Sequence, residues 1–471
     1  MKKQANFAVT LRLNAINRAT AAALVALCAV SAAQAADSLA LGAHSAGAGA
    51  AVTAGATPTQ QITGLYRGLL NRAPDANGLA YWQKMMAQGW TIAQVEASFK
   101  ESNEYRALTA SDSAGGTVAI PATAINYYVS PTGSDTAAGT KAAPFKTLAR
   151  AAKAAVKPGT TVFVAPGTYA GGFKTTGSGT ASQRIYWVST TKWGAKIVPP
   201  ASSTNKTAWD NRGNYVSIIG FDVDGSKLGS GTKWTLGIYT GGSYGVIQGN
   251  RVHHTANTIS CSSAGGSAIG VDSYYKGVMT DVIGNVVHDI GPAGCTYVQG
   301  IYVSTSGTIK NNVVYRVGSA AIHLWHDATN VKIINNTVSS SVFGIIVGGG
   351  DFYFTTAGAN NVHVHNNIVY DNKYGISEQG KTGTGNTYKN NLVFKNTTYN
   401  WQLRNGLKHT GTITSDPLLA GYSRTAAFPN FKPSASSPVI GRGLSTYAPA
   451  TDIDGRPRNA TTGYDMGAYQ H

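Results

Sequence analysis

Aromatic and titratable side chains recur at equivalent positions in a short repeated pattern, and these residue types are suited to binding and acid–base chemistry. The pattern is a small residue followed by isoleucine. Strand alternation sends the isoleucine to one face of a strand and the next side chain to the other. The outward positions hold Tyr239, Asp272, Tyr302, His323 and Trp325. Aromatic rings on an exposed sheet stack against sugar rings, while histidine, tyrosine and aspartate supply polar contacts. We therefore predict a glycan-binding face, and the alternative is a face merely covered by a loop.

A second set of side chains follows a different repeated pattern, Asn-x-Val. The residues there are His253, His288 and Tyr315, followed along the chain by His254, Asp289 and Arg316. We predict that His253 and His288 contact the substrate, and the alternative is that each is a satisfied structural histidine. His326, next to Asp327, lies near the aromatic positions and is also a candidate.

Two aspartates suggest a metal site. Asp222 and Asp224 have same-face spacing on a predicted strand, and paired carboxylates are hard ligands for calcium. The alternative is a turn, because Asp224-Gly225 is a turn signal. Ca²⁺ is the only cofactor that the sequence suggests.

Two cysteines, Cys261 and Cys295, remain once a predicted leader peptide is removed. In an oxidising compartment such a pair favours a disulfide over free thiols or catalysis. Both fall in loops that join one predicted strand to the next. The bridge would tie these loops together beside the groove.

Internal repetition predicts the architecture that positions these residues. The unit is a strand of form Asn-x-Val, a turn, and a second strand that begins with a small residue and isoleucine. One coil cannot bury its own apolar face, whereas stacked coils share a continuous core. We expect the repeated asparagine to form an internal ladder between coils. The repeats begin at Asn250, Asn285, Asn312, Asn336, Asn367 and Asn391, and the second strands at Gly237, Ala268, Gly300, Ala321, Gly344 and Gly375.

Both ends of this repetitive region resemble secreted bacterial right-handed parallel β-helix proteins of the pectate-lyase-like kind. The opening residues are Tyr127-Tyr128-Val129-Ser130-Pro131-Thr132-Gly133-Ser134-Asp135, and the closing ones are Asp452-Ile453-Asp454-Gly455-Arg456-Pro457-Arg458. The resemblance implies an all-β solenoid whose first coil is capped by a short helix, here over residues 147–156. It leaves the chemistry open, because this fold carries lyases, hydrolases, epimerases and binding proteins.

Lyases of this fold cleave uronate polymers by β-elimination, and this resemblance implies roles for particular residues. A base removes the C5 proton, an acid protonates the departing O4, and a cation neutralises the carboxylate. We assign His323 as base, Tyr302 as acid, and Arg316 or a bound cation as neutraliser. The aspartate-rich calcium motif of β-helix pectate lyases, the lysine/arginine motifs of alginate and chondroitin lyases, and the Asp-Pro-His-Asp sequence of alginate epimerases are absent from the sequence.

Two rival functions use other features. A glycoside hydrolase needs two carboxylates that flank the bond, which Asp272 with Asp327 or Asp289 would supply. A non-catalytic glycan-binding adhesin or matrix protein fits the basic charge and a flexible N-terminal part.

The segments before the β-helix have other compositions. Residues 1–35 read as a signal peptide cleaved near Ala35, and residues 36–58 and 108–124 as linkers rich in small residues. Residues 59–107 have helical periodicity. They resemble a small helical domain of unknown function found in secreted bacterial proteins, through Tyr66-Arg67, Leu70, Arg72, Pro74-Asp75, Gly78 and Tyr81-Trp82. The β-helix domain then takes residues 125–471.

Charge and composition limit the partners. The formal net charge is +17, and only 13% of residues are charged. This excess favours an acidic polysaccharide, with solubility or surface adhesion as the alternative. No nucleic-acid module or membrane-spanning run is present in the sequence, so we expect a secreted monomer, extracellular or periplasmic.

Overall fold

The computed structural model describes residues 57–70, 74–101, 120–201, 204–226, 233–259, 261, 265–458, 461 and 463–471. The predicted signal peptide, residue Arg72 and almost all of both predicted linkers lie outside these residues. No helix in the described part of the chain combines the length and the apolar character that a membrane crossing requires.

Three helices form a small unit of their own. They are α1 (Pro58–Leu70), α2 (Ala76–Ala87) and α3 (Ile92–Glu101). Ile62, Tyr66 and Phe99 are buried between them. The Asp75 side chain accepts a hydrogen bond from the Gly78 backbone N–H at 2.8 Å, which caps α2. The predicted helical segment is therefore present.

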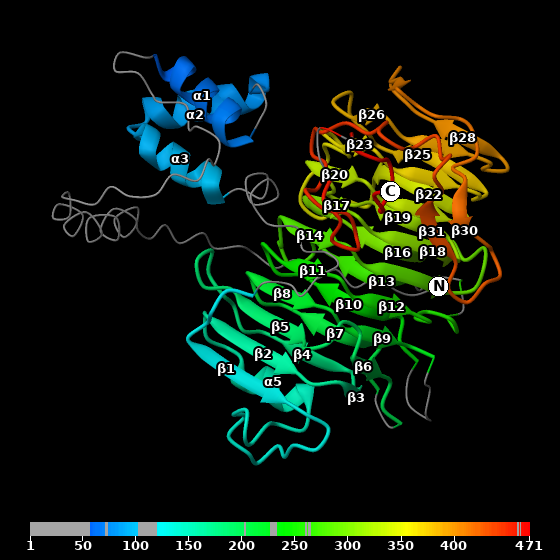
Figure 1. The fold of residues 1–471 in the computed structure, drawn as a ribbon. Coiled ribbons are helices and arrows are strands. Elements are labelled where there is room, and N and C mark those ends of the chain that lie inside the picture. Colours follow the sequence, from blue (N-terminus) through cyan, green and yellow to red (C-terminus); the bar gives the residue numbers. More distant parts are fainter. Residues whose placement is uncertain are drawn as a thin grey trace, which may run out of the picture. The chain divides into compact units, whose positions relative to one another are not determined.

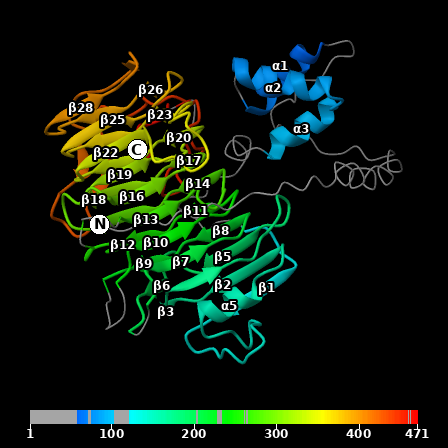
Figure 2. The same cartoon turned by 180° about the vertical axis from the view of Figure 1, so that it is seen from behind.

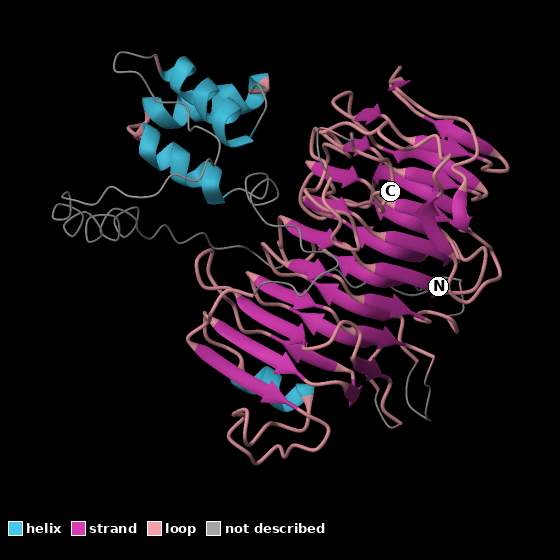
Figure 3. Cartoon of the chain, viewed as in Figure 1, coloured by secondary structure: helices cyan, strands magenta, loops and turns pink. Residues whose placement is uncertain are grey.

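The rest of the chain winds through three long parallel sheets, one strand of each sheet per coil, as a right-handed parallel β-helix (Figures 1 and 2). The predicted fold class is confirmed. Outside α1–α3 and the cap helix, Figure 3 shows only strands and loops among the described residues. The two predicted strand types form sheets 2 and 3. The strand of sheet 1, which precedes each asparagine, was missed.

Sheet 1 contains β1 (Ile125–Val129), β2 (Thr160–Val164), β5 (Ile185–Ser189), β8 (Val216–Ile219), β11 (Val246–Gln248), β14 (Thr280–Ile283), β17 (Gly307–Lys310), β20 (Val331–Ile334), β23 (His363–His365), β26 (Thr387–Lys389) and β29 (His409–Thr410). Sheet 2 contains β3 (Gly167–Ala170), β6 (Ala195–Val198), β9 (Asp222–Asp224), β12 (Arg251–His253), β15 (Val286–Ile290), β18 (Val313–Val317), β21 (Thr337–Ser339), β24 (Ile368–Tyr370) and β27 (Leu392–Phe394). Sheet 3 contains β4 (Phe173–Thr175), β7 (Thr207–Asn211), β10 (Leu236–Thr240), β13 (Gly266–Val271), β16 (Val298–Val303), β19 (Ala320–Leu324), β22 (Phe343–Gly349), β25 (Tyr374–Gly380) and β28 (Tyr399–Gln402).

The core is a set of aliphatic columns inside the coils. Each column stacks equivalent residues of successive strands, and the exposed fraction of every member is at most 1%. The predicted inward column of sheet 3 is among them. The columns are Ile238, Ile269, Ile301, Ile322 and Ile345 in sheet 3, Val252, Val287, Val314 and Val338 in sheet 2, and Ile247, Val282, Ile309 and Ile333 in sheet 1.

The predicted asparagine ladder is present between sheets 1 and 2. The ladder has six asparagines, one per coil. The backbone N–H and Nδ2 of each of the first five donate to the Oδ1 of the asparagine in the next coil at 2.9–3.1 Å. The ladder runs through Asn250, Asn285, Asn312, Asn336, Asn367 and Asn391, all fully buried. The residue before each is Gly or Asn with φ between 48° and 63°, a left-handed conformation that these two types adopt most readily.

Both ends of the described coils are covered or supported by other segments. Helix α5 (Leu148–Ala154) caps the first coil, as predicted, with Leu148 and Ala151 buried and Thr147 as its N-cap. The chain after β29 includes the antiparallel pair β30 (Leu419–Gly421) and β31 (Asn430–Pro433). It runs back along the outer face of sheet 2, where Phe431 packs against Tyr315 (Figure 1, orange and red).

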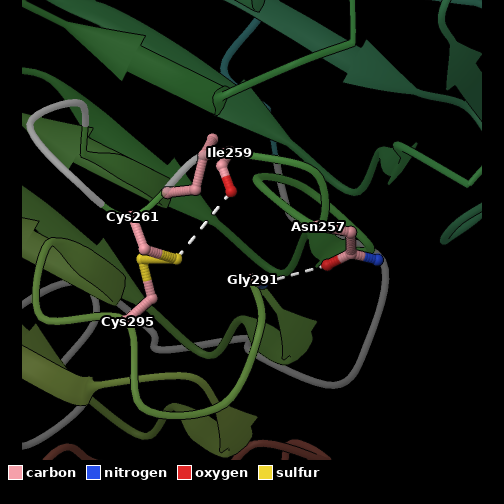
Figure 4. The surroundings of a disulfide bond; sticks show 5 residues. All are labelled: Asn257, Ile259, Cys261, Gly291 and Cys295. Atoms are coloured by element: carbon pink, nitrogen blue, oxygen red, sulfur yellow. Dashed lines mark hydrogen bonds between the residues drawn. A yellow bond between two sulfur atoms is a disulfide. The ribbon is translucent and has the colours of Figure 1, made fainter.

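The predicted disulfide Cys261–Cys295 is present. Cys261 follows β12 and Cys295 follows β15, so the bridge links loops of consecutive coils, both between sheets 2 and 3 (Figure 4). In the same region the Gly291 backbone N–H donates to the Asn257 side chain at 2.9 Å. These loops precede the strands of sheet 3.

We predict that Asn312→Ala destabilises the β-helix by about 2–4 kcal/mol, because the buried backbone N–H of Asn285 would lose the Oδ1 that accepts its hydrogen bond. The urea midpoint of unfolding measures this. Asn126→Ala, on an exposed asparagine of β1, is the matched control and should change stability by less than about 0.5 kcal/mol. Equal losses of stability in the two variants would contradict a stabilising role of the ladder.

We also predict that replacing both Cys261 and Cys295 by alanine lowers stability. The bridge closes a loop with a sequence separation of 34 residues, which in the chain-entropy model corresponds to about 3–4 kcal/mol. Thermal unfolding with and without reductant checks this: reductant should lower the Tm of the wild type and leave the double variant unchanged. A Tm that reductant does not change in the wild type would contradict the expectation.

Candidate functional site

The structure confirms the register of the predicted aromatic face on sheet 3. Tyr239 pairs with Gly270, Gly270 with Tyr302, and Tyr302 with His323 on successive strands. The rings of Tyr302 and His323 lie 5.4 Å apart. Trp325 begins the turn after β19. A Cβ atom at Gly348, Gly350 or Gly380 would come within 2.9 Å of its ring, so Trp325 lies closely over these glycines.

Exposed aromatic residues extend this face at the loops that follow β13 and β22. We call Tyr274, Tyr275, Tyr353 and Phe354 the aromatic patch; their exposed fractions are 58%, 51%, 39% and 56%. The ring of Tyr274 lies 5.0 Å from that of Tyr275 and 5.4 Å from that of Tyr353, so the two loops meet. These residues were not predicted from the sequence, although the runs Tyr-Tyr and Phe-Tyr-Phe after two strands were a usable signal.

A further aromatic row lies at the start of three strands in the later coils of sheet 3. Phe343 stacks on Tyr374 at 4.5 Å, and Tyr374 contacts Tyr399 at 4.9 Å. All three are partly exposed. The aromatic surface of sheet 3 is therefore longer than predicted.

His326 and Tyr353 form a hydrogen-bonded pair within the patch. The Nδ1 of His326 lies 2.7 Å from the carbonyl oxygen of Asp351, which can only accept, so Nδ1 carries the proton. In the neutral ring the other nitrogen, Nε2, then has the lone pair and accepts from the Tyr353 hydroxyl at 3.0 Å. The rings stack at 4.2 Å. This arrangement places Nε2 of His326 beside the hydroxyl of Tyr353.

His323, the predicted base, has a different environment. Both ring nitrogens are buried and have no hydrogen-bond partner among the described residues, although the residue as a whole is partly exposed. Burial, and then the proximity of His326, lowers its pKa to about 3. His323 is thus neutral at physiological pH, and its nitrogens are covered. The two histidines therefore differ, because both ring nitrogens of His326 are hydrogen-bonded whereas those of His323 are covered and have no such partner among the described residues.

Asp272 and Asp327 hold the loops that carry the patch. Asp272 accepts hydrogen bonds from the Tyr239 hydroxyl, from Ser304 Oγ at 3.0 Å and from the Tyr274 backbone N–H at 2.9 Å. Burial and the bond to Asp272 raise the pKa of Tyr239, so this hydroxyl stays protonated.

Asp327 holds the second loop, which follows β22, through its own hydrogen bonds. It accepts from the backbone N–H groups of Phe354 and Thr355 at 3.1 and 3.0 Å, and from Ser273 Oγ at 3.0 Å. Ser273 belongs to the first loop, so Asp327 also links the two. Both carboxylates are engaged in positioning.

Two cations border the patch. The guanidinium of Arg212 lies 3.5 Å from the ring centre of Tyr275 and 4.8 Å from that of Tyr239, and it pairs with Asp210 at 2.7 Å. The ammonium of Lys276 lies 5.6 Å from the ring centre of Phe354. Neither was singled out from the sequence.

Arg316 is not part of this site, which corrects the predicted constellation. It lies in the sheet 2 strand β18, and its Nε and Nη2 donate to the carboxylate of Asp289 at 2.6 and 2.9 Å. Its Nη1 also donates to the carbonyl of Ala426 in the C-terminal segment at 2.8 Å. Sheets 2 and 3 present different faces of the coil, so Arg316 and Asp289 do not share a face with His323.

His253 and His288 also lie on sheet 2 and are buried. Their rings stack at 4.8 Å, and the ring of His288 stacks on Tyr315 at 5.0 Å, which confirms the column but not the predicted substrate contact. The sequence could not distinguish an exposed column from one covered by the C-terminal segment.

Asp222 and Asp224 do not form an open pair for calcium. Both oxygens of Asp222 accept from Arg251, at 2.9 and 2.7 Å, and one also contacts His253 Nε2 at 2.9 Å. Burial opposes ionisation of Asp222, but the hydrogen bonds from Arg251 and His253 outweigh it and hold its pKa well below the usual range. Asp224 accepts from the Ser226 backbone N–H at 2.9 Å.

The disulfide-linked loops border a pocket at the junction of sheets 2 and 3 rather than the aromatic patch. The patch loops follow the strands of sheet 3, whereas the disulfide loops precede them. The pocket has a volume of about 410 Å³ and is lined by His254, Asn257, Asp289, Gly291, Ala293 and Arg316, among others.

The lowered pKa of His323 predicts an acid-sensitive contribution to stability. Between pH 6.5 and about 3 the unfolded chain binds a proton at this histidine and the folded chain does not, so stability falls as the pH falls, by at most about 1.4 kcal/mol per pH unit. His323→Phe should therefore lose less stability than the wild type between pH 7 and pH 5, measured by urea midpoints. Parallel losses in the two proteins would contradict the assignment.

Comparisons with known proteins agree with this architecture. The family described as Pel9A-like, right handed beta helix region matches residues 127–283, and the domain of unknown function DUF4214 matches residues 44–109. No curated protein matches the chain.

Several solved structures are similar. Pectate lyase Pel9A is 16% identical, with 74% of this chain and 97% of that chain covered and a TM-score of 0.49. The A-module of the mannuronan C-5 epimerase AlgE6 of Azotobacter vinelandii is 16% identical, with coverages of 56% and 68% and a TM-score of 0.40. An alginate lyase from Paenibacillus sp. is 18% identical, with coverages of 57% and 92% and a TM-score of 0.39.

The chain is a right-handed parallel β-helix protein whose residues 127–283 match the Pel9A-like family model, and residues 44–109 before them match DUF4214.

Proposed function

We propose that the protein binds an acidic polysaccharide on the aromatic patch and cleaves it there by β-elimination. The observation that carries this proposal is the exposed patch with the His326–Tyr353 pair inside it.

The patch suits a sugar chain. Four rings exposed by 39–58% lie on two adjoining loops, and the C–H faces of pyranose rings stack on such rings. Arg212 and Lys276 at its border, together with a net charge of +17, favour a polymer that carries carboxylates. We therefore propose uronate residues as the bound units.

His326 and Tyr353 supply the proton transfers of the elimination. The lone pair on His326 Nε2 takes the C5 proton, and the C5–H electrons form the C4–C5 double bond. The C4–O4 bond breaks, and the Tyr353 hydroxyl protonates the departing O4. The proton then passes from His326 to Tyr353 across their 3.0 Å hydrogen bond, which restores both groups.

The uronate carboxylate needs a positive partner, because the C5 proton is acidified when the charge that develops on the carboxylate is stabilised. Arg212 and Lys276 take the role that the sequence gave to Arg316. Tyr353 takes the role of Tyr302, because its hydroxyl contacts the base. Calcium is then unnecessary, and a chelator should leave the rate unchanged.

The two alternative functions, a glycoside hydrolase and a glycan-binding adhesin, would use other features of this surface. Hydrolysis would need Asp272 and Asp327 as free carboxylates, whereas both hold loops through several hydrogen bonds. A glycan-binding adhesin would need only the patch. The disulfide is in keeping with an exported protein.

The first test is incubation with a panel of acidic polysaccharides, followed by ultraviolet absorbance of the unsaturated product, with and without chelator. Rising absorbance on one polymer, unchanged by chelator, is expected. New reducing ends without absorbance would replace the lyase with a hydrolase. Binding without any product would leave an adhesin and overturn the catalytic part.

Substitutions in the patch should separate chemistry from binding. His326→Gln should lower kcat about 10²–10⁴-fold because it removes the base, whereas Tyr274→Ala should mainly raise KM. His409→Gln, on an exposed histidine of β29, is the matched control and should leave both constants unchanged. A full rate in His326→Gln together with a large loss in His323→Phe would return the base role to His323.

A further inference from the structure

Three metal-ligand side chains meet at the end of two neighbouring strands of sheet 2. Asp224 ends β9, His253 ends β12, and His254 is the next residue. One ligand atom from each lies within 4.8 Å of the others. We propose that these residues bind a divalent first-row transition metal ion, such as zinc, at a site separate from the aromatic patch.

A carboxylate behind His253 orients it as in metal sites. The Nε2 of His253 lies 2.9 Å from Asp222 Oδ1, and Arg251 holds Asp222 through both oxygens. Because this carboxylate accepts, Nε2 of His253 carries the proton and Nδ1 keeps its lone pair. Metal-bound histidines typically donate their other ring N–H to a carboxylate in this way.

The lone pair on His253 points at the second histidine. The two Nδ1 atoms lie 2.6 Å apart, and Asp224 Oδ1 is 3.6 Å from the same His253 nitrogen. Without an ion, a neutral His254 must place a proton between the two nitrogens. A metal ion would replace that proton and accept both lone pairs, with Asp224 as an anionic third ligand.

The backbone brings two consecutive histidines to the same place. Neighbours on a strand point to opposite faces, and for that reason the sequence did not group His253 with His254. His254 has a φ of 57°, a left-handed conformation that ends the strand and redirects its side chain. The same turn conformation recurs in the equivalent residues Asp289 and Arg316.

The ligand types decide between metals. Two imidazoles and one carboxylate suit zinc, cobalt, nickel or copper, whereas calcium and magnesium take oxygen ligands. Three protein ligands leave a coordination position open. His254 also lines the pocket of about 410 Å³ beside the disulfide-linked loops, so an ion can enter from that side (Figure 4 shows the loops).

The test is a titration of the protein, produced without a histidine tag and stripped with chelator, with Co²⁺ alone. Visible absorption bands of histidine-bound Co²⁺ should rise and saturate at one equivalent, and Zn²⁺ should displace them. Failure to reach a saturable single equivalent in the wild type would overturn the proposal.

Variants identify the ligands. His254→Ala, at a half-buried position, should weaken Co²⁺ binding at least 10-fold. Asp222→Asn should weaken it about 10–100-fold while leaving one equivalent, as expected for a carboxylate that orients a ligand. His409→Gln is the control and should bind as the wild type does, and circular dichroism shows whether each variant is folded. Unchanged affinity in a folded His254→Ala protein would contradict the site.

Discussion

The asparagine ladder fixes the strand register between successive coils, and the stacked columns of side chains depend on this register. A one-residue slip in one strand would exchange its inward and outward residues. The ladder prevents this because each buried amide requires the Oδ1 of the next asparagine at 2.9–3.1 Å. The left-handed residue before each asparagine makes the turn that places it there.

With the register fixed, two different surfaces arise from the same repeat. Sheet 3 carries the partly exposed side chains of Tyr239 and Tyr302 on its outer face, and the loops after its strands add the aromatic patch, which Asp272 and Asp327 hold in place. Sheet 2 is covered in part by the C-terminal segment, and its charged groups pair with one another. We propose the first surface for a polymer and the second for a metal ion beside a pocket.

Much of the fold could be predicted from the sequence, because asparagine and isoleucine recur at set positions and the period-2 alternation of strands is local. The strand of sheet 1 was missed in each coil, because no single residue type marks its start: β11 begins with valine, β14 with threonine and β23 with histidine. The assignment of Arg316 failed for another reason: spacing along the chain does not tell which sheet a residue lies on. The patch depends on contacts between loops of different coils, such as Tyr274 with Tyr353, and these are not local.

The central claim is that the aromatic patch is where the polysaccharide binds. Amide hydrogen exchange with and without an acidic oligosaccharide tests it most directly. The account predicts new protection in residues 272–276 and 350–358. Protection confined to residues 289–293 and 316–318, around the pocket between sheets 2 and 3, would contradict it.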